Sequence, residues 1–208
     1  RAPGRYTQMS RKMKFTTLTA VAAPYEPENV DTDQILPARF LKMPRAGGYG
    51  QFLFHDARAA DPDFVLDREP YREAKILVAN RNFACGSSRE GAAFAFYDAG
   101  FRSVIAPSFS DIFYNNCLRN GIVPVRLSEE VCRSLRRMLS EKPGTMLTVD
   151  LEKQLVIEGK NEHPFSVDAF FREMLLQGVD ELGLTLSMRD QIEAFERRYA
   201  AEFPWAAR

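Results

Sequence analysis

The chain has 208 residues, with 28 basic and 28 acidic side chains and therefore a formal net charge of zero. Hydrophobic residues make up 45% of the chain and charged residues 27%, which is ordinary for a globular protein and excludes a disordered one. The balanced charge disfavours nucleic acid or an anionic membrane surface as a partner. The sequence has no run of about 18 apolar residues, so we expect no membrane span.

Cysteine and histidine content limits the metal chemistry. Cys85, Cys117 and Cys132 form an odd set without a C-x-x-C pair, and only two histidines occur. Such cysteines are typical of a reducing compartment, and we expect the protein to be cytoplasmic. We also expect this chain to bind neither zinc nor an iron–sulfur cluster by itself.

The first part of the chain combines one strand with a long irregular stretch. Residues 1–15 are expected to be a tail or remnant, and residues 16–208 a single domain. A strand is predicted over 16–22, where β-branched and small residues alternate. Residues 26–40 contain turn-forming Asp, Asn and Pro before a short apolar segment. Residues 43–74 are predicted to be irregular with short helices, and connections of that length are commonly functional.

From residue 75, strands and helices alternate at short intervals. Strands are predicted over 75–79, 103–106 and 122–127, and helices over 88–99 and 108–121, with Gly100 and Gly121 at the helix ends. Short links of this kind imply parallel pairing with right-handed crossovers. The sequence therefore predicts an α/β fold with a parallel βαβαβ core.

The remaining chain adds helices and a short antiparallel portion. Ser128 is expected to cap an amphipathic helix that carries Val131, Leu135, Met138 and Leu139. A three-stranded meander is predicted over 146–151, 154–158 and 163–167. Two helices should follow, one capped at or near Ser166 and carrying Phe170, Phe171, Met174 and Leu175, and one over 188–199.

The segment NRNFACGSSREG, residues 80–91, places many polar groups between two apolar segments. It follows a predicted parallel strand and opens a helix, which is where open α/β sheets bind ligands. In one interpretation, Ser87 and Glu90 form a capping box and Arg89 and Glu90 a solvated pair. In the other, the next helix is apolar on nearly every side, so its N-terminus is buried and attracts an anion. Arg89 would then bind a carboxylate through two of its guanidinium nitrogens.

Two further residues of this loop have local interpretations. Cys85 near a helix N-terminus is a conceivable nucleophile, but neither histidine stands in a context that suggests a base. We favour the role of a small buried side chain for this thiol. Gly86 supplies backbone freedom in a tight turn. The loop matches neither the G-K-[ST] phosphate motif nor the G-x-S-x-G nucleophile motif.

Asp31 and Asp33 flank Thr32 in the segment NVDTDQILPARF. Two carboxylates at this spacing could hold a metal ion, but no third ligand is evident in the sequence. We therefore favour turn and cap residues that open the next helix.

The long stretch ANRNFACGSSREGAAFAFYDAGFRSVIAPSFSDIFYNNCLRNGIVPVRL and the earlier NVDTDQILPARFL carry a family resemblance. They resemble the small subunit of bacterial 3-isopropylmalate dehydratase, the swivelling domain of the aconitase superfamily. GQFLFHDAR, DFVL and the closing GLTL also fit. The resemblance implies a three-layer β/β/α fold. It also implies a catalytic centre shared with a separate large subunit that carries a [4Fe–4S] cluster.

The resemblance further implies roles for the polar residues. Ser87 would be the general base, and Arg89, Ser88 and Gly86 would bind a small hydroxy-dicarboxylate. Asp31, Thr32 and Asp33 would form a loop near the active centre. The implied reaction is that of a hydro-lyase, which interconverts 2-isopropylmalate and 3-isopropylmalate by dehydration and rehydration in leucine biosynthesis.

The sequence departs from the family pattern near this site. Ala84 stands where the family usually has Gly, Gly91 where it usually has His, and Ala93-Phe94 replace a common Pro-Trp. We expect loss of the histidine side chain to free space beside the anion pocket. Two alternatives stay open: a related hydratase acting on another hydroxy-dicarboxylate, and a carboxylate-binding module without catalysis.

Overall fold

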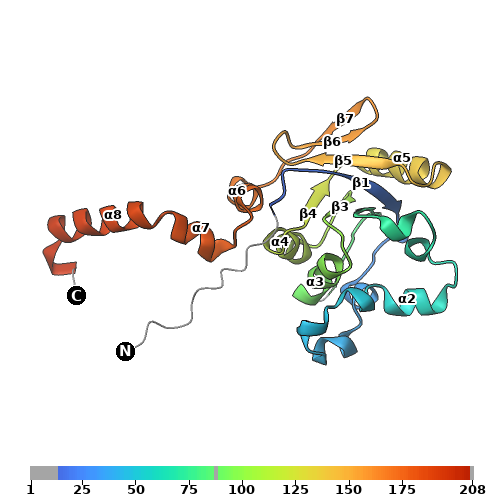
Figure 1. Cartoon of the computed structure of the whole chain (residues 1–208), viewed down its shortest axis with the longest axis horizontal. Coiled ribbons are helices and arrows are strands. Elements are labelled where there is room, and N and C mark those ends of the chain that lie inside the picture. The colour runs from blue at the N-terminus through green and yellow to red at the C-terminus, as the bar shows by residue number, and fades with distance from the viewer. Residues whose placement is uncertain (1–13, 87–88, 207–208) are drawn as a thin grey trace.

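A single mixed sheet organises the chain in the computed structural model, which describes residues 14–86 and 89–206. Its strands run in the order β4-β3-β2-β1-β5-β6-β7 (Figure 1). They are β1 (Thr17–Pro24), β2 (Ile76–Val78), β3 (Ser103–Ala106), β4 (Val123–Arg126), β5 (Met146–Asp150), β6 (Leu155–Glu158) and β7 (Asn161–Pro164). The first four pair in parallel, and β5, β6 and β7 continue antiparallel from the other edge of β1. The predicted parallel core and antiparallel portion are confirmed.

Helices occupy the longer connections between these strands and the chain after β7. They are α1 (Thr32–Ile35), α2 (His55–Ala60), α3 (Glu90–Asp98), α4 (Asp111–Arg119), α5 (Glu129–Glu141), α6 (Ala169–Gln177), α7 (Glu181–Ser187) and α8 (Arg189–Glu202). Short 3-10 helices are η1 (Ala38–Lys42), η2 (Arg45–Gly47), η3 (Gly50–Phe52), η4 (Val65–Asp67), η5 (Tyr71–Glu73) and η6 (Pro204–Ala206). The stretch 43–74 is thus irregular with short helices, as the sequence predicts.

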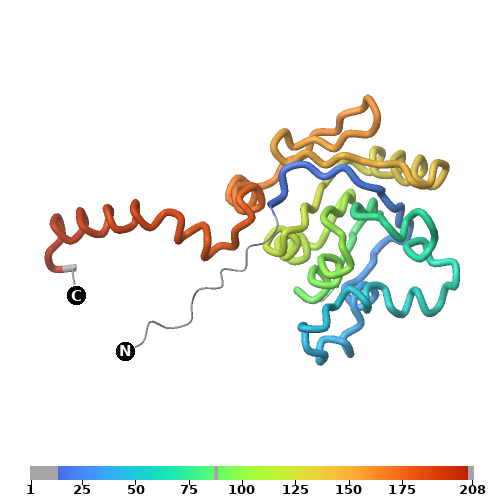
Figure 2. Tube along the Cα trace, in the orientation of Figure 1, coloured from blue at the N-terminus to red at the C-terminus, as the bar shows by residue number. Residues whose placement is uncertain are grey.

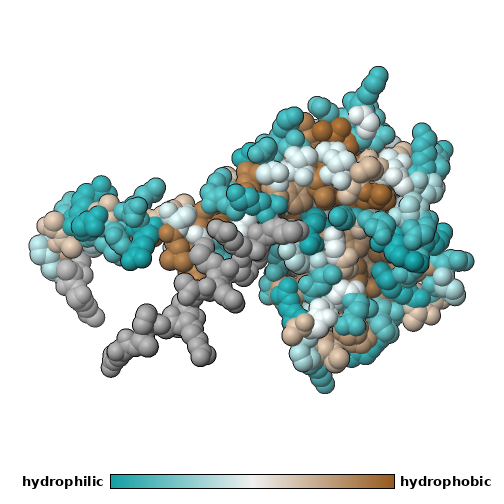
Figure 3. All heavy atoms as spheres, viewed as in Figure 1, coloured by the Kyte–Doolittle hydropathy of each residue, from teal (hydrophilic) through white to brown (hydrophobic). Residues whose placement is uncertain are grey.

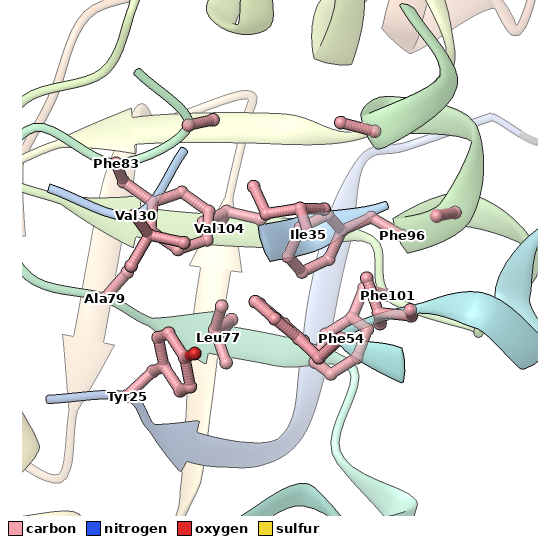
Figure 4. Close-up of a cluster of buried hydrophobic side chains, with 14 of the residues drawn as sticks. Tyr25, Val30, Ile35, Phe54, Leu77, Ala79, Phe83, Phe96, Phe101 and Val104 are labelled. Atoms are coloured by element: carbon pink, nitrogen blue, oxygen red, sulfur yellow. The ribbon is translucent and has the colours of Figure 1, made fainter. Parts of the chain in front are cut away.

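Alternate residues of the central strands point into two separate apolar cores. Leu77 and Val104 belong to a core with α3, α4 and the aromatic residues of the irregular stretch (Figure 4). Ile76 and Ile105 belong to a second core, which α5 and the antiparallel strands close. The strands β2 and β3 are therefore buried on both faces, which explains why they consist of apolar residues apart from Ser103. The curled sheet and its covering helices form the predicted three-layer β/β/α arrangement.

The irregular stretch lies directly on α3. A Cβ added at Gly50 would sit 2.5 Å from backbone atoms of Asp98 and Ala99, so only glycine permits this approach. Tyr49 N donates to the Asp98 carboxylate at 2.8 Å, and Arg45 lies over the Phe94 ring. These contacts fix the stretch beside the helix that follows the polar loop.

Several predicted element ends differ in the structure. Helix α3 begins at Glu90 with Arg89 as N-cap, two residues later than expected. The cap of α6, predicted at or near Ser166, is Asp168, whose carboxylate accepts hydrogen bonds from the Phe170 and Phe171 amides. Strand β7 lies over 161–164 instead of 163–167 because it pairs with β6 through a tight turn at Gly159. The Ser128 cap on α5 is confirmed.

The C-terminal helices α7 and α8 leave the body of the molecule as an extended arm (Figure 2). Helix α7 was not expected from the sequence, whereas α8 matches the helix predicted over 188–199. In the part of the chain that the structure describes, no helix is both long and apolar enough to cross a membrane. Most of the predicted N-terminal tail, residues 1–13, lies outside the described residues.

Candidate functional site

The segments that follow β1, β2 and β3 meet at the carboxyl edge of the parallel strands. Cys85 N donates to Val30 O at 2.9 Å, and Thr32 N donates to Cys85 O at 3.1 Å. Phe83 N donates to Ser108 O at 3.0 Å, which joins the third segment. The polar loop is thus held between the two other segments at the edge where open α/β sheets bind ligands.

The polar loop turns tightly through left-handed backbone conformations. Asn82, Ala84 and Gly86 have φ angles of 54°, 57° and 85°. For a non-glycine residue this conformation costs about 1–2 kcal/mol, so Ala84 adds backbone strain to the loop. At Gly86 an added Cβ would lie 3.4 Å from the Asp31 Cβ, so the loop passes close to the start of α1.

Asp31 is the N-cap of α1 in a capping box. Its carboxylate accepts a hydrogen bond from Gln34 N at 2.7 Å, and Gln34 Oε1 accepts one from Asp31 N at 2.9 Å. Thr32 is 2% exposed. The interpretation of Asp31 as a helix-opening residue is therefore confirmed, and its carboxylate is engaged by the backbone.

Asp33 and Arg89 form an ion pair between α1 and the N-cap of α3. The Arg89 guanidinium donates to Asp33 Oδ1, which also accepts from Ala38 N at 2.9 Å. The hydrogen bond from Arg89 lowers the pKa of Asp33 below its ordinary value, against an opposing effect of burial. The Arg89 side chain is 20% exposed, so a partly buried guanidinium already has one carboxylate beside it.

The start of α3 differs from the capping-box interpretation of the sequence. Because Arg89 occupies the N-cap position, Glu90 is the first helical residue rather than the third, and its carboxylate accepts from Asn120 Nδ2 at 3.0 Å. Arg89 therefore pairs with Asp33 instead of Glu90. Ser87 and Ser88 lie outside the described residues, and the roles assigned to them stay predictions.

The surroundings of α3 are as apolar as its sequence suggests. Gly91, Ala92, Ala93, Ala95 and Phe96 are all buried. The N-terminal amides of this helix, with the positive end of its dipole, therefore lie at the edge of the apolar core. Together with Arg89 they form a cationic corner that suits a carboxylate.

The space at Gly91 is filled. A Cβ added there would lie 2.5 Å from Leu41 Cδ2 and 3.0 Å from Leu36 Cδ2. The expectation that a missing histidine leaves free space is therefore wrong, because these two leucines pack where the side chain would be.

A second charged cluster lies beside the loop and was missed from the sequence. Arg39 on η1 forms a two-contact ion pair with Asp56, and His55 Nδ1 lies 3.1 Å from the same carboxylate. Hydrogen bonds from Arg39 and His55 lower the pKa of Asp56 to about 2. Asp56 lines one pocket together with Asp31, Asp33 and Gln34. The signal was the His-Asp-Ala-Arg run in GQFLFHDAR, but nothing local indicates that η1 would bring Arg39 to it.

The thiols and acidic groups that the structure describes do not gather into a metal centre. Among the residues that the structure describes, no group of three or more His, Cys, Asp or Glu side chains could hold a metal ion. Cys117 and Cys132 are fully buried, whereas Cys85 is half-buried and donates to Asn29 O at 3.3 Å. Burial raises the pKa of Cys132 to about 11 and that of Cys117 well above its ordinary value.

Comparisons with known proteins match both the body and the arm. The aconitase C-terminal domain model matches residues 12–130. A model of the C-terminal domain found in the small subunit of 3-isopropylmalate dehydratase matches residues 182–208. The first match contains the loop and the candidate site, and the second contains α8 and most of α7.

Curated relatives match over nearly their full length. The 3-isopropylmalate dehydratase small subunit of Granulibacter bethesdensis is 50% identical over 200 residues, covering 94% of this chain and 96% of the relative. That of Gluconobacter oxydans is 51% identical over 191 residues, covering 89% and 92%. The crystal structure of 3-isopropylmalate dehydratase (leuD) from Methanocaldococcus jannaschii superposes with a TM-score of 0.62 at 25% identity, covering 87% of this chain and 99% of the other.

Proposed function

Because the chain belongs to the 3-isopropylmalate dehydratase small-subunit family, we propose that it provides the substrate-carboxylate side of that enzyme's active centre. The reaction interconverts 2-isopropylmalate and 3-isopropylmalate by loss and re-addition of water in leucine biosynthesis. The observation that carries the proposal is the cationic corner formed by Arg89 and the start of α3 at the carboxyl edge of the sheet. We place the enzyme in the cytoplasm, in keeping with its three free cysteines.

Arg89 binds one carboxylate of the substrate in this proposal. In the free chain the guanidinium is paired with Asp33, whose side chain is 52% exposed. An incoming carboxylate therefore competes with Asp33 for the same donors. A planar guanidinium has enough N–H groups to hold the substrate with two parallel hydrogen bonds, which fixes its orientation.

Ser87 takes the proton in the dehydration step. It stands two residues before Arg89 in the sequence, and the family resemblance implies that it is the general base. The base removes a proton from the carbon next to a carboxylate, and the C–H electron pair forms the double bond as the hydroxyl leaves the neighbouring carbon. A neutral serine is a weak base, so the mechanism requires the ionised hydroxyl in the assembled enzyme. Ser88 and Gly86 complete the substrate-binding loop.

The remaining parts of the centre belong to a large subunit. The described residues of this chain include no cluster of metal ligands, which fits a cofactor held elsewhere. A [4Fe–4S] cluster on the large subunit would supply Lewis acidity toward the leaving hydroxyl. Asp31, Thr32 and Asp33, at the start of α1, face the shared centre in this proposal.

The test is reconstitution with the cognate large subunit under anaerobic conditions. We expect the two chains to co-purify and to interconvert the isopropylmalates, and the isolated small subunit to have no activity and no iron. A panel of hydroxy-dicarboxylates assayed with the same complex identifies the substrate. If the complex prefers another acid to isopropylmalate, the substrate assignment would change, whereas the reaction class would stay the same. A complex inactive toward the whole panel would contradict the proposal.

A further inference from the structure

The arm formed by α7 and α8 presents apolar side chains that the described chain leaves uncovered. Met188, Ile192, Phe195 and Tyr199, which we name the arm stripe, are 39–53% exposed. No residue of α8 is buried. On α7, Leu182 and Leu186 are 65% and 49% exposed, and hydrophobic spheres gather where the arm leaves the body (Figure 3). Such a surface is unusual for a solvated helix.

The spacing of the arm stripe is that of a helix-packing seam. Steps of four, three and four residues place all its side chains along one face of α8. The remainder of the helix carries charged pairs, with Arg189 Nε 2.8 Å and Arg197 Nη1 3.9 Å from the Glu193 carboxylate. This division into an apolar seam and a charged face is typical of a helix that packs on another helix or in a groove.

The base of the arm is attached to the body at defined points. Leu184 is 4% exposed, and Asp180 caps α7 through Gly183 N at 2.7 Å. Arg119 on α4 forms an ion pair with Glu181 at 2.9 Å. The body therefore sets the direction of the arm and holds the stripe away from its own cores (Figure 2).

The family matches separate the arm from the catalytic body. The aconitase-type model matches 12–130, whereas a model specific to the dehydratase small subunit matches 182–208. The arm is therefore a feature of the dehydratase small subunit, in which the aconitase-type domain is a separate chain. A separate subunit must hold its partner without a covalent link, and the pocket at the candidate site offers only a few apolar side chains, such as Val30 and Ala57, beside Asp31, Asp33, Gln34 and Asp56.

We propose that the arm stripe docks into an apolar groove of the large subunit. The inference rests on the proposed function, which supplies the large subunit as the occupant. The size of the stripe favours this occupant over a second copy of the chain. Its four side chains would bury on the order of 400 Å² on this chain, whereas a stable interface buries about 800 Å² on each partner. The stripe is too small to hold a dimer by itself and suits one part of a larger interface.

The experiment compares two double variants of the full chain, Ile192→Ser/Phe195→Ser in the stripe and Asp190→Ser/Arg197→Ser on the opposite face of α8. Both introduce the same two serines, so their effects on helix propensity are similar. For each variant we would measure the Kd for the anaerobically prepared cognate large subunit and the turnover of isopropylmalate at saturating small subunit. Light scattering would give the mass of the isolated chain, and thermal unfolding its Tm.

We expect the stripe variant to bind at least about tenfold more weakly, since exposed apolar anchors dominate interfaces. The control variant should bind like the wild type.

The outcomes separate the inference from the proposed function. Weaker binding by the stripe variant, with turnover at saturation and Tm unchanged, supports the docking surface. Equal Kd values for wild type and stripe variant would overturn it while leaving the proposed reaction intact. A wild-type dimer that the stripe variant breaks, without change in the Kd, would assign the stripe to a second copy and overturn the inference. A drop in Tm confined to the stripe variant, with unchanged Kd, would overturn it too, by showing that the arm packs on its own body.

A tight wild-type complex without turnover would contradict the proposed reaction. Weaker binding by the stripe variant would still support docking in that case.

Discussion

Arg89 and Asp33, 56 positions apart in the sequence, form an ion pair that joins the N-cap of α3 to the first turn of α1. The pair connects the two loops that the family resemblance assigns to the active centre. It also means that the guanidinium proposed to bind substrate has a carboxylate partner before substrate arrives. The carboxylates of Asp33 and of the substrate should therefore compete for Arg89, and a mutation of Arg89 or Asp33 should change this competition.

Replacing Arg89 with lysine should weaken binding of the dicarboxylate and leave the fold intact. Lysine keeps the charge but lacks the planar fork. A charge-assisted hydrogen bond contributes roughly 1.5–3 kcal/mol, so the KM of the reconstituted enzyme should rise about 10- to 150-fold. The inhibition constant of a non-reactive dicarboxylate should rise in parallel. Arg137→Lys, on the exposed face of α5, is the matched control and should change neither constant. Unchanged constants for Arg89→Lys would remove Arg89 from the site.

Asp33→Asn should strengthen binding of a non-reactive dicarboxylate. The amide cannot compete as an anion for Arg89, yet its oxygen can still accept from Ala38 N. Because Asp33 is half exposed, the pair contributes no more than about 1 kcal/mol, so the gain should be at most about fivefold. Isothermal titration of the reconstituted complex measures it. Weaker binding would instead mean that Asp33 orients the guanidinium.

The same pair gives a pH dependence of stability with a defined sign. The pKa of Asp33 is depressed in the folded chain, mainly by the hydrogen bond from Arg89. Its contribution is therefore fully present above the ordinary carboxyl pKa and is lost as the pH falls through the folded value. Urea unfolding of wild type and Asp33→Asn should differ most at neutral pH and converge in acid. A difference that grows in acid would contradict this assignment.

Ser87→Ala should lower turnover by at least about 10²-fold in the reconstituted complex, which is the scale of lost general-base catalysis. The KM should change less, because the base acts in the chemical step. Arg89 is the N-cap residue of α3, so we expect the Tm to stay within about 1 °C of the wild type. Ser128→Ala, which removes the α5 cap, is the contrasting control: it should cost about 1 kcal/mol of stability with turnover retained. A lower Tm with retained turnover for Ser87→Ala would instead make Ser87 a structural residue.

Thiol titration should distinguish one cysteine from the other two. Cys85 is half-buried, whereas Cys117 and Cys132 are fully buried, and burial raises their pKa values and so disfavours their reactive thiolate form near neutral pH. A disulfide reagent should modify one thiol in the native chain and three after denaturation. Cys85→Ser should abolish the native reaction. A second reactive thiol in that variant would show that one of the buried cysteines opens to solvent.

The sequence by itself determined the elements whose signals are local. The largely apolar segments 75–79 and 103–106 predicted strands, and the structure has β2 and β3 there. Ser128 predicted the start of α5, because a serine cap acts within one helical turn. The position of the polar loop at the carboxyl edge followed from the alternation of strands and helices. The extent of a single domain over 16–208 stays a prediction.

Only the tertiary structure decided which distant groups meet. Asp33 reaches Arg89, and Asp56 reaches Arg39, because the segments after β1 fold over the sheet edge along a path that no local periodicity encodes. Leu41 fills the space at Gly91 for the same reason. Helix α3 begins at Glu90, later than predicted, because Arg89 has an extended conformation and pairs with Asp33. A long-range contact, rather than a local capping motif, therefore sets the start of this helix. Caps and apolar periodicity are properties of neighbouring residues, whereas the site is made from contacts between segments that the fold alone brings together.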